Sequence, residues 1–311
     1  MRKVLLATTA LVAMGGVSAA SADISISGSA TWMYQTTSGT GTGPAAAEST
    51  NFDTAQTDAN ISMSSTLDNG MSLSGLVSLD ETGVDDAGWS ISGDFGKLGF
   101  GGGGANDGFG TTATGLTADE GTTLTAANFT SVHNDYIDHS DVSLTLPAVS
   151  GVTFAIGLSD GDTAGANEDD GNGTQWGVTY AVPAGSMGVT VAYAHGSTGA
   201  ANTDETSAGI TVTAGDAKVV LAQNTSGDLE ADSIGVSYKV SDALSVQAYT
   251  GTAENDANAN YEVKDTAYGL TYTITPGMSM SITHNDFEGE NGTAAQDESG
   301  TRTVVALDVT F

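Results

Sequence analysis

Apolar residues recur at every second position through most of this 311-residue chain. Val152, Phe154, Ile156 and Leu158, for example, alternate with small or polar residues, and the last segment alternates in the same way as far as Phe311. Such a period of two is typical of a β-strand that has one apolar and one polar face. The chain is therefore predicted to be built almost entirely from strands.

About sixteen such segments can be distinguished. Some are joined by tight turns, as at 67–70 and 275–277, and the others mostly by longer polar connections such as 36–50, 160–172 and 288–299. Turns that alternate with long loops predict an up-and-down meander. The segments lie near residues 24–35, 51–65, 71–80, 87–95, 97–102, 139–146, 151–159, 173–182, 187–196, 205–213, 216–225, 230–240, 243–252, 261–274, 277–287 and 300–311.

The face opposite the apolar residues consists mainly of Ser, Thr, Gly and Ala, and most acidic residues lie in the long connections or at strand ends. A small, uncharged polar face suits the wall of a water-filled lumen. Sixteen strands are enough to leave such a channel, and closure removes every unpaired strand edge within lipid. We therefore predict an all-β fold, a 16-stranded antiparallel transmembrane β-barrel. Aromatic residues near segment ends are expected to form interfacial girdles on it.

The first 22 residues have the pattern of a signal peptide. Arg2 and Lys3 precede an apolar stretch, and Ala20-Ser21-Ala22 has the form of a cleavage site. We expect residues 1–22 to be removed and residues 23–311 to form the exported barrel domain.

The charge balance is strongly acidic. The chain has 38 Asp and Glu against 7 Lys and Arg, a formal charge of −31, and no cysteine. Such a charge argues against binding to nucleic acid, and the lack of cysteine excludes disulfides and thiolate metal sites.

One connection is far longer than the rest. About 36 residues separate Gly102 from His139, and they include apolar residues such as Phe109, Leu116 and Phe129. A loop of this length with so much apolar surface is expected to pack against something, so we predict a long third loop that folds inward and narrows the pore. Its acidic residues, which would line the constriction, are Asp107, Asp119, Glu120, Asp135 and Asp138.

Three features resemble the general diffusion porins of Gram-negative bacteria, in particular those of the alphaproteobacterial, Rhodobacter-like type. They are the Ala-Ser-Ala site leading into Asp23, the glycine-rich segment 93–101 before the long third loop, and the terminal Phe311. The resemblance implies an outer-membrane homotrimer, a third loop that forms the eyelet, and passive diffusion of small hydrophilic solutes and ions. It also implies contact with outer-membrane lipid and lipopolysaccharide, and a Phe311 that is read by the outer-membrane assembly machinery.

The chain departs from this family in its basic residues. Those porins oppose the acids of the third loop with a cluster of Arg and Lys on the barrel wall, but residues 4–96 contain neither. By alternation Lys239 and Arg302 face the lumen, near opposite ends of their strands. Acids at a constriction act on a passing ion almost unscreened, so we predict a cation-selective channel.

Alternative interpretations remain open. A secreted acidic adhesin or surface-layer protein with β-sandwich repeats would also be rich in strands. A barrel hydrolase would use one of four histidines, but these lack ligand-pair spacing and a nucleophile elbow, so no enzyme activity is expected. We expect no cofactor except Ca²⁺, which the acidic clusters Asp85-Asp86, Glu168-Asp169-Asp170 and Asp297-Glu298 could hold. The histidines are His133, His139, His195 and His284.

Overall fold

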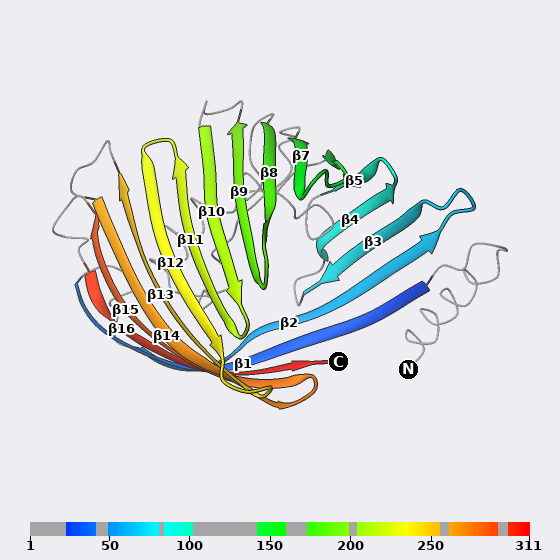
Figure 1. The fold of residues 1–311 in the computed structure, drawn as a ribbon. Helices are drawn as coiled ribbons and strands as arrows, with labels where there is room; N and C mark the ends of the chain where they lie inside the picture. Colours follow the sequence, from blue (N-terminus) through cyan, green and yellow to red (C-terminus); the bar gives the residue numbers. More distant parts are fainter. Residues whose placement is uncertain are drawn as a thin grey trace, which may run out of the picture.

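The computed structural model describes residues 23–41, 49–80, 84–101, 142–159, 173–198, 204–255, 261–291 and 298–311. These residues form sixteen antiparallel strands that close into one barrel (Figure 1). The all-β barrel predicted from the alternation is confirmed. The strands are β1 (Asp23–Gly41), β2 (Ser49–Thr66), β3 (Ser72–Leu79), β4 (Val84–Gly93), β5 (Gly96–Phe100), β6 (Val142–Thr145), β7 (Val152–Ser159), β8 (Gly173–Ala184), β9 (Met187–Thr198), β10 (Asp204–Ala214), β11 (Ala217–Ser226), β12 (Leu229–Lys239), β13 (Leu244–Asn255), β14 (Tyr261–Thr275), β15 (Met278–Asn291) and β16 (Glu298–Thr310).

Each strand pairs with its neighbours in the chain, and β1 closes the barrel by pairing with β16. Short turns at one end make this order possible. At the β2–β3 turn, Gly70 has a φ of 82°, a conformation that side-chain-bearing residues rarely adopt, and its amide donates to the Leu67 carbonyl at 2.9 Å. Gly277 takes the corresponding position in the β14–β15 turn with a φ of 80°.

The strands differ greatly in length. β1 and β2 have 19 and 18 residues, whereas β5 and β6 have 5 and 4. The polar stretches 36–50 and 288–299, which we expected to be connections, are partly strand, because β1 runs to Gly41 and β15 to Asn291. Since about ten tilted residues cross a bilayer, the longest strands extend well beyond it.

The apolar face of the alternation lies on the outside of the barrel. Ile156 on β7 is 41% exposed, whereas its neighbour Ala155 is 4% exposed. The same outward exposure holds for Val152, Phe154 and Leu158. The apolar side chains therefore do not form a dry interior, as they would in a soluble sandwich. Within the described ranges, no helix is long and apolar enough to cross a membrane.

Most aromatic side chains of the described residues lie on this outer face. On β8 and β9 the rings of Trp176 and Tyr193 are 5.4 Å apart, and Phe154 stacks on Trp176 at 6.5 Å. Tyr249 is an exception to the expected girdles. It is buried and points to the same side of β13 as Gly251 and Ala253, which is the inner side, so it belongs to the inner wall.

Candidate functional site: the inner wall of the barrel

The inner wall of β1 to β5 is a surface of serine hydroxyls. The register pairs Asp23 with Ser64, Ser64 with Ser74, and Ser74 with Ser90, so these side chains lie in one row across four strands. The hydroxyls of Ser74 and Ser90 are 2.7 Å apart and share a hydrogen bond. One of these two hydroxyls keeps its own proton free to donate elsewhere.

A hollow of about 340 Å³ lies against this serine row. The carboxylate of Asp23 on β1 and the ammonium of Lys97 on β5 line it together with the serines. Lys97 is paired in register with Ser92 and Thr145, which places it on the inner face. The hollow thus combines hydroxyl groups with one charge of each sign.

The inner wall of β13 to β16 is packed instead of open. Tyr249, Asp265, Asn285 and Arg302 all face inward and are buried. The amide of Asn285 donates to the Asp265 carboxylate at 3.4 Å, and Arg302 donates from Nη2 to the amide oxygen of Gln35 on β1. These hydrogen bonds join neighbouring strands within the wall, although among the described residues the amide oxygen of Asn285 has no hydrogen-bond partner.

The register places both predicted lumen-facing bases in the inward phase. Arg302 is near the loop end of β16 and only 6% exposed. Lys239 is the last residue of β12 and is exposed, and its ammonium contacts Asp242 of the following turn at 2.7 Å. The hydrogen bond and the charge of Lys239 hold the pKa of the Asp242 carboxyl below its usual value.

Two further bases, Lys218 and Lys264, lie on opposite faces of the barrel wall. Lys218 pairs in register with Thr213 and shares the inward phase of the buried Val220. Lys264 lies on the outer face of β14, where it forms an ion pair of 2.6 Å with Glu262. The described bases are therefore spread over distant strands and do not form a cluster.

The predicted constriction residues Asp107, Asp119, Glu120, Asp135 and Asp138 lie outside the described residues. The same holds for His133, His139 and the acidic cluster at 168–170. Among the residues that the structure does describe, no three His, Asp or Glu side chains gather as metal ligands would.

The carboxy-terminal Phe311 closes the seam of the barrel. Its amide donates to the Gly28 carbonyl at 2.9 Å, and its own carbonyl accepts from the Gly28 amide at 2.8 Å. A Cβ on Gly28 would lie 2.7 Å from the Phe311 ring, so a glycine is needed there for the ring to lie over β1. The ring is 80% exposed on the outer face.

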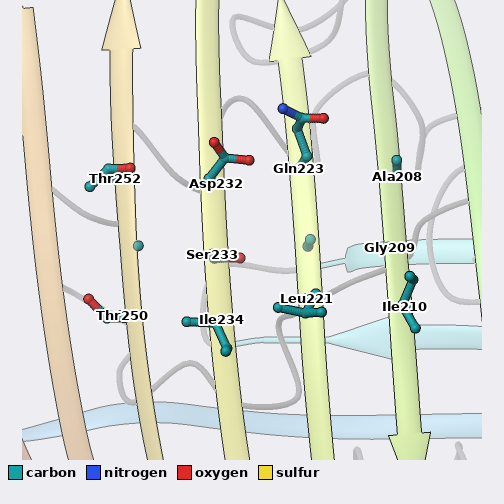
Figure 2. Close-up of a pocket in the computed structure, with 12 residues that line it drawn as sticks. Ala208, Gly209, Ile210, Leu221, Gln223, Asp232, Ser233, Ile234, Thr250 and Thr252 are labelled. Atoms are coloured by element: carbon teal, nitrogen blue, oxygen red, sulfur yellow. The ribbon is translucent and has the colours of Figure 1, made fainter.

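A second and larger hollow, of about 540 Å³, lies on the outside of the barrel over β10 to β13 (Figure 2). Ile210, Leu221 and Ile234 surround its apolar part, and Gln223 and Asp232 lie toward the loop end. Because it belongs to the outer face, it is not part of the lumen.

The two described histidines also belong to the outer face. The ring of His195 lies 5.9 Å from Trp176, and that of His284 lies 5.2 Å from Tyr268. They therefore lie among the aromatic residues of the outer wall, where neither faces the lumen.

The serine-lined hollow was not among the predicted sites. Each of its serines follows the alternation of its own strand, but their meeting in one row depends on the cross-strand register, which a single sequence does not specify. Residues 4–96 contain no Lys or Arg, so Lys97 is the first base of this wall along the chain.

The comparisons with known proteins agree with this architecture. A family model for the Gram-negative porin matches residues 7–304. A search of curated protein sequences gives no match.

Solved structures show the same fold at low sequence identity. OmpF of Salmonella typhi, solved in complex with daunomycin, is 14% identical and superposes with a TM-score of 0.70, covering 93% of this chain and 97% of that one. A mutant of the Rhodobacter blastica porin is 16% identical with a TM-score of 0.69, covering 93% of this chain and all of that one. OmpT of Vibrio cholerae in its trimer form is 15% identical with a TM-score of 0.60, covering 93% and 99%.

The matched family, the closed barrel of sixteen strands, and the apolar outer and polar inner faces lead to one conclusion. The chain belongs to the Gram-negative porins, barrels that form diffusion channels in the outer membrane.

Proposed function

We propose that this porin is a homotrimeric, cation-selective channel for the passive diffusion of small hydrophilic solutes and ions, exported by a signal peptide at residues 1–22. The observation that carries the proposal is the division of the two faces. Apolar side chains such as Ile156 lie outside, and hydroxyl-bearing side chains such as Ser74 lie inside. The lumen thus replaces hydrocarbon with a path of water and hydroxyl groups.

The proposed selectivity is supported by the distribution of charge. On the described inner wall, four acids are offset by four bases, so the wall itself is close to neutral; they are Asp23, Asp58, Asp265 and Asp308 against Lys97, Lys218, Lys239 and Arg302. The excess of 38 acids over 7 bases in the chain therefore belongs mainly to the connections and rims. Carboxylates there raise the local concentration of cations and lower that of anions.

The test is the reversal potential of single channels in a KCl gradient across a planar bilayer. We expect stepwise conductance and a potential of the sign set by K⁺. An anion preference would refute the selectivity but leave the channel in place, whereas the absence of any conductance would contradict the channel itself.

A pair of variants locates the charges responsible. Asp119→Asn with Glu120→Gln removes two charges from the predicted constriction, and we expect it to reduce the cation preference. Glu288→Gln with Glu290→Gln removes the same charge from exposed positions on the outward phase of β15, and we expect it to leave the reversal potential nearly unchanged. Equal effects of the two pairs would contradict the assignment of the third loop to the constriction.

A further inference from the structure

The serine-lined hollow of β1 to β5 has hydrogen-bonding groups that the wall itself does not use. Within the described part of the chain, the hydroxyls of Ser25, Ser62 and Ser64 make no hydrogen bond with another residue's side chain, and these three residues line the hollow. The linked hydroxyls of Ser74 and Ser90 keep one further donor proton. The hollow therefore presents several donors and acceptors to whatever occupies the lumen.

The charged groups that line the hollow indicate which kind of solute it can bind. Asp23 repels an anion and Lys97 repels a cation, and cleavage before Asp23 would add an α-ammonium group next to its carboxylate, so charges of both signs line the hollow. A neutral molecule with many hydroxyls can use both groups, because it donates to the carboxylate and accepts from the ammonium. Such charge-assisted hydrogen bonds are stronger than bonds between neutral partners.

The shape of the hollow agrees with this class. Its volume of about 340 Å³ is at the lower end of small-molecule sites in proteins. Leu76, the one large inward apolar side chain that lines it, can pack against the C–H face of a sugar ring. We propose that the hollow is a weak binding site for neutral polyhydroxylated solutes, of the class of mono- and disaccharides, on their way through the lumen. The proposal rests on the proposed channel function.

The experiment uses the porin in a planar bilayer, with maltose as the probe and heptaethylene glycol as a control of comparable mass that has only two terminal hydroxyl groups. We expect maltose to lower the single-channel conductance in a saturable way and to add excess current noise. Heptaethylene glycol should lower conductance only in proportion to its concentration. A maltose effect that is equally linear would overturn the proposal.

The variants assign the effect to the hollow. Ser74→Ala with Ser90→Ala is expected to raise the half-saturating maltose concentration about tenfold, which corresponds to the loss of about two neutral hydrogen bonds. Ser281→Ala removes an inward hydroxyl from β15, outside the hollow, and should leave it unchanged. Equal effects of the serine pair and of Ser281→Ala would also refute the site.

The conductance of each variant in KCl alone separates the two proposals. We expect the serine pair to conduct KCl as the wild type does, which shows that the barrel has folded. A wild-type protein that conducts nothing would contradict the channel, whereas a conducting wild type without saturable maltose block would contradict only the binding site.

Discussion

The inner walls of β1–β5 and β13–β16 follow the same alternation of side chains, yet one is open and the other is packed. In the open wall, small serines leave a hollow that is bordered by Asp23 and Lys97. In the packed wall, Tyr249, Asp265 and Arg302 fill the space, Asp265 accepts a hydrogen bond from Asn285, and Arg302 donates one to Gln35. Alternation therefore decides which face a residue takes, but not whether that face lines a hollow or is packed.

The largest expected loss of stability follows from substitution of Arg302, the buried cation of the packed wall. Arg302→Ala removes a charged hydrogen-bond donor that is 6% exposed and leaves a void beside Gln35, so we expect a loss of about 3 kcal/mol in the free energy of unfolding. Lys218→Ala changes an inward base that is only half-buried, and should cost less than about 1 kcal/mol. Urea titration of the barrel refolded in phospholipid vesicles measures both. Similar losses for the two variants would show that burial of Arg302 in the packed wall contributes no more than the half-buried position of Lys218 on β11.

A smaller effect compares apolar residues on the two walls. Val263→Ala in β14 truncates a side chain that is 1% exposed, and we expect it to cost about 2 kcal/mol. Leu76→Ala in β3 removes more atoms, but they border the hollow and are already in contact with water, so the expected loss is below about 1 kcal/mol. The same urea titration ranks the two variants, and a larger loss for Leu76→Ala would reverse the comparison.

The smallest effect concerns the turn between β12 and β13, outside both walls. The Lys239 ammonium lowers the pKa of the Asp242 carboxyl, so the pair stabilises the folded state above the ordinary carboxyl pKa of 3.8 and loses this contribution as the pH falls through the lowered value. Both groups are fully solvated, and such pairs contribute little. Asp242→Asn should therefore leave stability at pH 7 within error of the wild type and flatten its pH dependence slightly below pH 4, as thermal unfolding at several pH values would show.

Much of the fold could be predicted because the alternation survives in nearly every strand. The outward positions of four residues of β7 follow from it directly: Val152, Phe154, Ile156 and Leu158. Residues two apart share one face of a strand, and in a membrane barrel the apolar face contacts lipid. The inward phase of Arg302 follows in the same way. The strand ends could not be predicted, because residues 36–41 are Thr, Ser and Gly and carry no apolar alternation.

The errors and omissions have a physical cause as well. Tyr249 was expected among the girdle aromatics because aromatics near strand ends usually face the membrane interface, although its phase with Gly251 already indicated the inner wall. The serine-lined hollow could not be predicted at all. It needs five strands in one register, and register is fixed by turns and packing around the whole barrel and not by any one segment.

The bond between Gly28 and Phe311 has a consequence for how the protein is made. The first strand of the barrel finds its second neighbour only when β16 is in place, as the pairing of Ala30 with Val309 requires. Until then, two long unsatisfied edges remain that would pair with any other extended chain. Contacts between such distant parts of a sequence form slowly. A chain without β16 thus cannot close the barrel, and its unpaired edges favour aggregation over insertion into lipid.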